Sequence, residues 1–393
     1  MRRISCGLFT FVLAALVAGC GDENTATIGV LAPIDGGLTQ FGRGIRNSVE
    51  LAVDEAGQQD LIPGWKIRFV AVDDSSDPDV GRANVERLLE DPSVVGVVGT
   101  YNSGVARAVL PDLAAAGIAL VSPGNTDPSL TLGPDRENPV RPYDNYFRMV
   151  AHDAQQGGFL AKAARDLGFH FVSIVTDAKP VSQGLASDFR DAFESLGGEI
   201  LSFEAVPDGD TDYEPYVQRA ADKGPELLFF GGEYDHAVLA KVAAHEVGLL
   251  VPLMGGDGVQ ADQYIAALGP LAAGDLASSV GRPVELEPKG PEFLAAYHAA
   301  GVSEVPSTFG PYAYDAANIL LGAASRALEH RTRVDASVRE EIRARVQGVT
   351  NADLVNSSGA VTGQIGFDAF GDTVHPVLTL YRVEEGSWTP VVQ

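Results

Sequence analysis

The sequence of 393 residues contains only two cysteines, Cys6 and Cys20, and both lie near the N-terminus. Beyond Cys20, disulfide bonds, thiol redox chemistry and zinc–thiolate centres are therefore excluded. The seven histidines are scattered, and the HEVGL segment at His245 lacks the second histidine of a zinc-protease motif. No G-x-S-x-G segment of a serine hydrolase is present. Nothing in the sequence requires an enzyme.

Basic residues are also scarce, with 28 Lys and Arg against 53 Asp and Glu and a net charge of −25. This balance argues against nucleic acid as a partner, because phosphate backbones attract basic surfaces. The segment from Gly96 to Gly104 follows a strand pattern, but its glycine spacing does not match a dinucleotide-binding loop. We therefore predict no cofactor.

The N-terminus has the layout of a bacterial secretory signal, with two arginines, an apolar run from Leu8 to Ala18 and small residues before Cys20. The LVAGC segment that ends at Cys20 resembles the lipobox of bacterial lipoproteins, in which the cysteine is lipidated. We expect a signal peptide over residues 1–19 and a lipidated tether over 20–26. An uncleaved membrane anchor is the alternative, although the apolar run is shorter than the roughly 20 residues of a membrane span.

After cleavage, 393 − 19 = 374 residues remain, which favours two domains. From Thr27 onward, short apolar runs alternate with amphipathic stretches, as strands alternate with helices in an α/β fold. Runs such as Val94 to Gly99 are apolar throughout, which is typical of a parallel sheet covered on both faces. A second series of the same kind starts near Phe147.

We therefore predict two doubly wound parallel-sheet lobes joined by a hinge that the chain crosses more than once. Lobe 1 is expected to comprise residues 27–146 and 279–361, and lobe 2 residues 147–278 and 362–393. The tail from 363 to 391 alternates like a hairpin around Gly371. Ligands of such sheets lie beyond the carboxyl ends of the strands, so two facing lobes would form a cleft.

Six segments, taken in order, carry a family resemblance: IGVLAPIDGGLTQFGRGIRNSVELAVDEA, VDDSSDP, VVGTYNSG, ALVSPGNTDPSLT, FRMVAHDAQQG and LMGGDGV. From about Ile28 to Tyr381, the chain resembles the periplasmic leucine/isoleucine/valine-binding family of type I solute-binding proteins. The resemblance implies a two-lobed clamshell that closes on one small solute and docks on an ABC permease.

In that family the ligand carboxylate is held by a serine at a helix start and by a Ser-Pro-x-x-Thr turn. The matching positions here are Ser103, Gly124, Asn125 and Thr126. A hydroxyl and main-chain N–H groups at a helix N-terminus can stabilise an anion without a buried cation. Alternatively, Ser103 is only a helix cap and Thr126 a turn residue.

The family's acidic residue for the ligand ammonium corresponds to Asp257, at the end of an apolar strand. A carboxylate that faces a cleft can pair with a cation, although Asp257 could instead cap the helix that follows. An anion site on one lobe and a cation site on the other would together hold an α-amino acid and draw the lobes together.

The chain departs from the family where aromatic side chains cover the ligand. Val181 stands at the position of the aromatic lid of the second lobe. Phe41 matches the aromatic of the first lobe, and either lines the pocket or packs at the start of a helix. Glu233 and Tyr234 fall where the family has a tyrosine near the cleft. An inward Glu233 would favour a basic, hydroxylated or amide-bearing ligand over a leucine-like one, whereas an outward Glu233 would have no such effect.

The sequence thus predicts a solute-binding protein that is lipid-anchored to a bacterial membrane and faces the periplasm or cell exterior. It would capture an amino acid or a related small polar solute and deliver it to an ABC permease. Two alternatives remain open: a receptor of the same fold that reports a solute to a signalling partner, and an enzyme that acts in the cleft.

Overall fold

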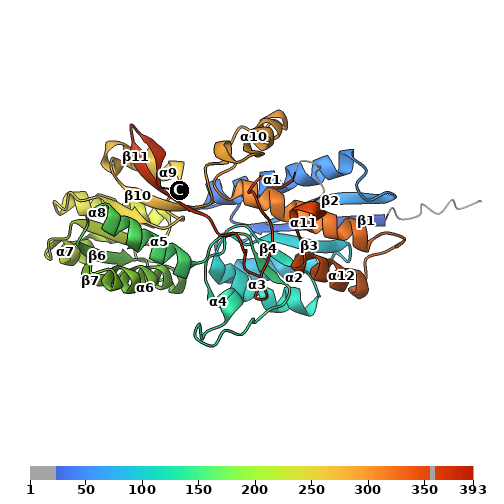
Figure 1. Cartoon of the computed structure of the whole chain (residues 1–393), viewed down its shortest axis with the longest axis horizontal. Coiled ribbons are helices and arrows are strands. Elements are labelled where there is room, and N and C mark those ends of the chain that lie inside the picture. The colour runs from blue at the N-terminus through green and yellow to red at the C-terminus, as the bar shows by residue number, and fades with distance from the viewer. Residues whose placement is uncertain (1–23, 355–358, 393) are drawn as a thin grey trace, which may run out of the picture.

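The computed structural model describes residues 24–354 and 359–392. The predicted signal peptide and the predicted lipidation at Cys20 lie outside the described residues. The chain forms two lobes along its long axis, each built on its own sheet (Figure 1). Within the described part, no helix is both long enough and apolar enough to span a membrane.

The first lobe is built on a five-stranded parallel sheet with the order β2-β1-β3-β4-β5. Its strands are β1 (Asn24–Ala32), β2 (Trp65–Asp73), β3 (Val94–Gly99), β4 (Leu120–Ser122) and β5 (Tyr146–Arg148). All residues of β3 and β4 are buried, as expected for apolar strands covered on both faces.

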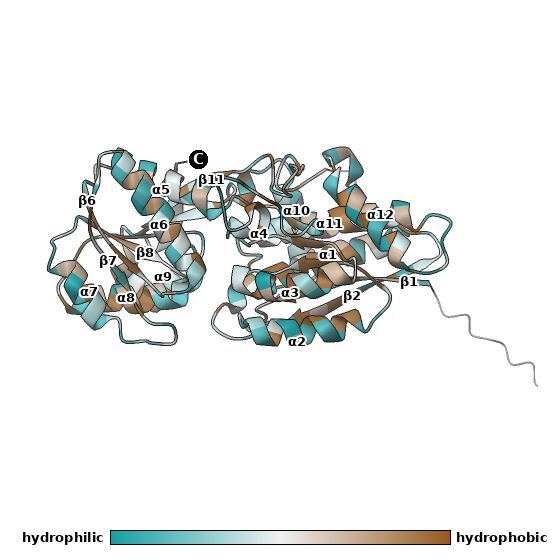
Figure 2. Cartoon of the chain, turned by 90° about the horizontal axis from the view of Figure 1, so that it is seen from below, coloured by the Kyte–Doolittle hydropathy of each residue, from teal (hydrophilic) through white to brown (hydrophobic). Residues whose placement is uncertain are grey.

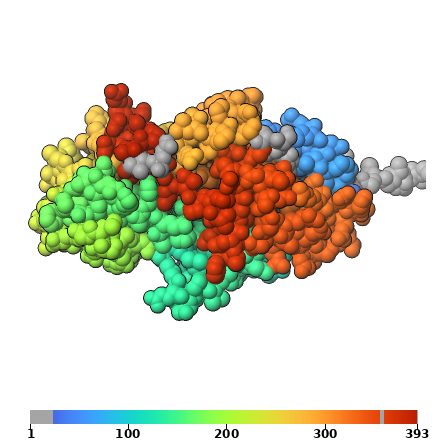
Figure 3. Space-filling view, in the orientation of Figure 1, coloured from blue at the N-terminus to red at the C-terminus, as the bar shows by residue number. Residues whose placement is uncertain are grey.

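Helices from both ends of the chain cover this sheet. They are α1 (Thr39–Gln58), α2 (Pro78–Leu89), α3 (Ser103–Ala115), α4 (Ser129–Leu132), α10 (Gly290–Ala299), α11 (Gly310–Ala327) and α12 (Ala336–Gln347). α2 and α3 pack together on one face, whereas α1, α11 and α12 cover the other. A Cβ at Gly96 of β3 would lie 2.6 Å from Leu320 Cδ2, so a larger residue there would force the Leu320 side chain of α11 to shift. Figure 3 shows the late segments of the chain, orange to red, against the blue start of the same lobe.

The second lobe contains a seven-stranded sheet with the order β12-β11-β10-β9-β8-β6-β7. Its strands are β6 (Phe171–Thr176), β7 (Glu199–Ala205), β8 (Leu227–Gly231), β9 (Leu253–Gly255), β10 (Leu276–Val280), β11 (Leu378–Glu384) and β12 (Ser387–Val392). The five strands from β6 to β10 are parallel, and β11 and β12 add an antiparallel hairpin.

The helices of this lobe are α5 (Asp153–Asp166), α6 (Pro180–Ser195), α7 (Glu214–Ala221), α8 (Tyr234–Glu246) and α9 (Asp262–Leu268). α5 and α6 share a core with one face of the sheet, and α7 to α9 pack on the other. Figure 2 shows brown, apolar strands inside each lobe and teal, polar residues along the outer helices. The predicted α/β fold of two mostly parallel sheets is confirmed, and the residue limits of the lobes stay a prediction.

The predicted hairpin around Gly371 is only partly correct. A tight reversal does occur there, closed by a single bridge between Phe367 and Thr373. The long hairpin of the tail, formed by β11 and β12, turns instead at Glu385 and Gly386, which both have positive φ angles of 51° and 78°. The alternation of the tail is compatible with either turn, and residue 372 forms only an isolated bridge with Arg148 of β5.

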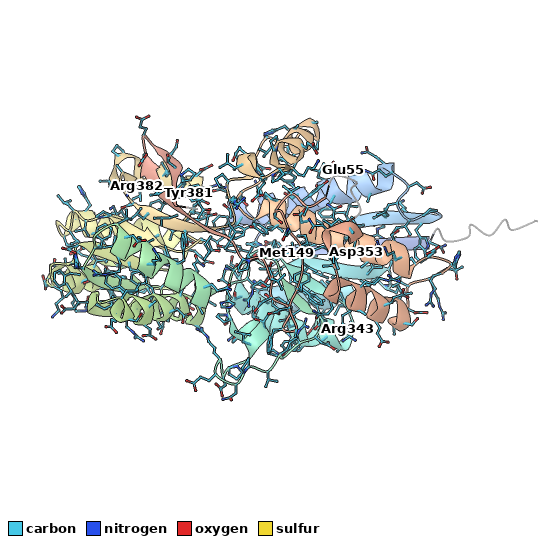
Figure 4. The ribbon with its side chains drawn as sticks, viewed as in Figure 1. Glu55, Met149, Arg343, Asp353, Tyr381 and Arg382 are labelled. Atoms are coloured by element: carbon cyan, nitrogen blue, oxygen red, sulfur yellow. The ribbon has the colours of Figure 1, made fainter. Side chains whose placement is uncertain are left out.

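The chain passes between the two sheets three times, after β5, after β10 and before β11. Met149, just after β5, lies near the middle of the molecule, and Tyr381 of β11 lies in the second lobe (Figure 4). At the first crossing, the fully buried Arg148 binds Asp372 of the third crossing, with 2.8 Å between Nε and Oδ1. Arg148 also donates to the carbonyl of Asp127, in the loop after β4. One buried ion pair therefore joins two crossings to that loop.

Candidate functional site

A cavity of about 490 Å³ lies between the lobes, where the carboxyl ends of both sheets meet. Loops after β2, β3 and β4 line it from the first lobe, and loops after β6, β8 and β9 from the second. Six of the nine residues predicted for binding line this cavity: Ser103, Gly124, Thr126, Val181, Glu233 and Asp257. Asn125, Phe41 and Tyr234 do not line it.

Ser103 is the first residue of α3, and Asn102 occupies the cap position. The Ser103 Oγ accepts hydrogen bonds from the backbone N–H groups of Thr126 and Asp127, each at 3.2 Å. A serine hydroxyl has two lone pairs and one proton, so these bonds leave only its proton to bind a further partner. Ser103 is therefore a fixed donor at the N-terminus of a helix, where an anion is favoured.

Gly124 and Asn125 shape the loop after β4. Their N–H groups donate to Ser122 Oγ at 3.2 and 2.9 Å. The Asn125 side chain is fully buried and donates to the carbonyl of Tyr101 at 2.7 Å, away from the cavity. A Cβ at Gly124 would lie 3.0 Å from the Tyr101 ring. In this loop, Gly124 permits close packing and Asn125 fixes the backbone.

On the second lobe, Asp257 follows β9 and is 7% exposed. Gln156 holds it from two sides: Gln156 Nε2 donates to Asp257 Oδ1 at 3.0 Å, and Gln156 Oε1 accepts from the Asp257 N–H at 2.7 Å. Burial raises the pKa of Asp257 to about 6, against the hydrogen bond from Gln156, which lowers it. The carboxylate is thus preformed, and its negative charge is poorly solvated.

Asp153, the first residue of α5, also lines the cavity, and sequence reasoning missed it. It is 2% exposed, and burial followed by the charge of Asp257 raises its pKa well above the ordinary range of an aspartate. Neither acid forms an ion pair with a lysine or arginine among the described residues. Two buried carboxyl groups therefore face one cavity, which favours a cation between them.

Glu233 points into the cavity rather than outward. Its carboxylate accepts from Lys179 Nζ at 3.1 Å and from Asn102 Nδ2 at 2.5 Å, so it connects the two lobes. Burial raises the pKa of Glu233 and the charge of Lys179 lowers it. An additional carboxylate thus enters the site, as the sequence allowed, but a lysine that sequence reasoning missed lies against it.

The aromatic side chain that lines the cavity is Tyr101, which the sequence analysis did not single out. Phe41 is fully buried behind it, with 4.8 Å between the two ring centroids. Tyr234 packs edge-on against Phe41 across the lobes, and its hydroxyl donates to the carbonyl of Gly37. Val181 lines the cavity from α6 without covering it as an aromatic ring would.

The sequence did contain signals for the missed residues. Tyr101 stands in VVGTYNSG and Asp153 in FRMVAHDAQQG, which are two of the segments that carry the family resemblance. Lys179 lies two residues before Val181, at the cap position of α6. All three residues lie in loops or at helix starts that follow a strand, which is the signal that could have found them. The described residues contain no group of three or more His, Cys, Asp or Glu side chains suited to a metal ion.

The cavity between two lobes agrees with the comparison to known proteins. Residues 25–387 match the sequence model of a family described as periplasmic binding protein. The chain belongs to this family. It is a family of solute-binding proteins, and membership implies a location outside the cytoplasm.

Several relatives of this periplasmic binding protein are named for their ligands. A "Leu/Ile/Val-binding protein homolog 2" of Brucella abortus is 28% identical over 389 residues, which cover 98% of this chain and 96% of that one. The crystal structure of the branched-chain amino acid transporter substrate binding protein LivJ from Streptococcus pneumoniae, in complex with isoleucine, has a TM-score of 0.79 at 26% identity. That match covers 94% of this chain and 99% of LivJ. A solute binding protein of an ABC transporter from R. palustris, in complex with benzoate, has a TM-score of 0.78 at 22% identity, with 94% and 96% of the two chains covered.

Proposed function

We propose that the protein captures a free α-amino acid in the interlobe cavity and delivers it to an ABC permease, while Cys20 anchors it to the membrane through lipid. The observation that carries the proposal is that one side of the cavity favours an anion and the other side favours a cation. The first lobe offers the fixed Ser103 hydroxyl at the start of α3, and the second offers the buried carboxyl groups of Asp153 and Asp257.

An α-amino acid satisfies both sides at once. Its carboxylate accepts the Ser103 proton, and its ammonium neutralises the acids of the second lobe, whose charge is poorly solvated. Because each group of the solute bonds to a different lobe, binding favours the closed arrangement. A permease that recognises the closed form would thereby distinguish loaded from unloaded protein.

A protein of similar fold was solved in complex with benzoate, so we compare an amino acid with a solute that has a carboxylate and no ammonium group. Such a solute has no cation, so Asp257 would be buried beside it as an unpaired charge or both acids would have to hold protons. Burying an unpaired charge is costly, and two acids in one cavity increase that cost. The acid pair therefore favours an amino acid over an aromatic acid.

The test uses the soluble protein that begins at Gly21. Thermal-shift screening against the common amino acids identifies a ligand, because a solute that binds only the native state raises its melting temperature. Titration calorimetry then compares that amino acid with its decarboxylated amine and its deaminated acid. Tight binding of the amino acid, with large losses for both analogues, is expected. An acid analogue that binds as well as the amino acid would contradict the proposal.

A further inference from the structure

Three polar side chains line the cavity beside the Ser103 and Asp257 sites. Asn102 comes from the first lobe, and Lys179 and Glu233 come from the second. The carboxylate of Glu233 accepts from both neighbours, at 2.5 Å from Asn102 Nδ2 and at 3.1 Å from Lys179 Nζ. We call these three residues the polar wall.

The orientation of the Asn102 amide follows from its neighbour. An ionised carboxylate only accepts hydrogen bonds, so the NH₂ group of Asn102 must face Glu233. The carbonyl oxygen Oδ1 then points the other way, and it is buried without a hydrogen-bond partner among the described residues. A buried acceptor of this kind is costly unless a donor reaches it. Asn102 lines the cavity, but its Oδ1 has almost no accessible surface while the lobes are in contact, so a solute must bind before they close to supply that donor.

Lys179 contributes the complementary group. Its ammonium carries three protons and donates one to Glu233 at 3.1 Å, while Asp177 Oδ2 lies 3.4 Å away without accepting a hydrogen bond. Protons of Lys179 therefore remain for an acceptor in the cavity. Because Lys179 and Glu233 balance each other's charge, the polar wall presents one donor and one acceptor with no net charge of its own.

We propose that the polar wall reads the side chain of the solute and selects a carboxamide. This inference rests on the proposed function, which places the amino-acid head between Ser103 and Asp257. The amide carbonyl of the solute accepts a free proton of Lys179, and its NH₂ group donates to Asn102 Oδ1. A leucine-like side chain leaves both groups unpaired. A carboxylate side chain cannot donate to Asn102 Oδ1.

The test compares solutes of equal size by titration calorimetry. The first set is asparagine, leucine and aspartate, and the second is glutamine, methionine and glutamate. Within at least one set, the amide is expected to bind at least about tenfold tighter than both partners, because an unpaired buried polar group discriminates by about that factor. Leucine, aspartate or a basic amino acid that matches the amides would overturn the inference.

Two variants assign the preference to the polar wall. Asn102→Ala removes the acceptor, and Lys179→Met removes the donor while keeping the aliphatic stem. Each is expected to reduce the amide-to-leucine affinity ratio below about threefold. The ratio is measured because loss of the Asn102–Glu233 contact also changes lobe closure for every solute. Lys162→Met, which breaks an exposed pair with Asp166 far from the cavity, is the matched control and keeps the ratio. An unchanged ratio in both wall variants would refute the assignment.

The same experiment separates the two proposals. If no α-amino acid binds, the proposed function fails and this inference fails with it. If amino acids bind, but leucine binds as tightly as asparagine and glutamine, only the role of the polar wall is wrong.

Discussion

Replacing Asp257 by asparagine tests the site through two opposite effects. The substitution keeps the shape of the side chain and an oxygen that can accept from Gln156 Nε2, which lies 3.0 Å from Asp257 Oδ1. It removes the charge and replaces the second carboxylate oxygen by an NH₂ group. If Asp257 serves to bind an ammonium group, the variant should bind the amino acid more weakly. In the absence of the amino acid, the variant should be more stable than the unmodified protein.

The gain in stability follows from the pKa. Burial raises the pKa of Asp257 from 3.8 to about 6, so the folded protein holds this proton more tightly than the unfolded chain does. The penalty is absent below pH 3.8, grows as the pH rises toward 6 and is complete above it. At 1.36 kcal/mol per pKa unit, it amounts to about 3 kcal/mol at neutral pH. Asp257→Asn should therefore raise the free energy of unfolding by up to about 3 kcal/mol at pH 7.5, and by little at pH 3.5.

The loss in binding follows from the missing charge. A hydrogen bond to a charged group contributes about 1.5–3 kcal/mol, which corresponds to a Kd that is about 10- to 150-fold higher. In the unmodified protein, affinity should also improve as the pH rises from 5 to 7, because Asp257 must lose its proton to pair with ammonium. This dependence should be shallower in the variant.

Urea unfolding without solute and titration calorimetry with it measure the two effects. A variant that binds as tightly as the parent would remove Asp257 from the site. A variant that loses both binding and stability would show that Asp257 maintains the loop structure instead of holding the ligand.

Two further substitutions test other parts of the site and hinge. Ser103→Ala should raise the Kd of the amino acid about tenfold and that of its carboxamide derivative less, because a hydrogen bond to a charged carboxylate is stronger than one to a neutral amide oxygen. Calorimetry with both ligands measures the two losses. Equal losses would contradict the role of Ser103. Arg148→Met leaves Asp372 as a buried, uncompensated charge and should lower the free energy of unfolding by about 3–5 kcal/mol in urea titrations. As a control, Arg68→Met breaks an exposed pair with Asp91 and should lower the free energy of unfolding by less than about 1 kcal/mol. Similar losses of stability for the two arginine variants would show that the buried hinge pair contributes no more than an exposed one.

The sheet architecture was predictable because it depends on local patterns. Apolar runs such as 94–99 can be buried only between two helical layers, and their alternation with helices fixes the parallel order. The tail was less predictable. Gly371 and Gly386 both have positive φ angles and close reversals, and the sequence does not show that β11 and β12 form the long hairpin around the second.

The site was predictable where a functional group sits at a strand end inside a recognisable segment, as Ser103 and Asp257 do. The site was not predictable where the direction of a side chain decides whether the residue reaches the cavity. Phe41 and Tyr101 stand at adjacent places in the first lobe, yet only Tyr101 reaches the cavity. Nothing in the sequence distinguishes Lys179 from the other charged residues, because its contact with Glu233 forms only in the folded protein.

The late position of α11 and α12 in the chain has a consequence for biosynthesis. The strands of the first sheet are complete at residue 148, but the helices that cover β3 on one face comprise residues 310–347. The ribosome therefore synthesises nearly the whole second lobe before α11 and α12 can cover that apolar face. Chains cut short after β10 should aggregate through it, whereas the full-length chain can reach its final form only after synthesis has passed α12.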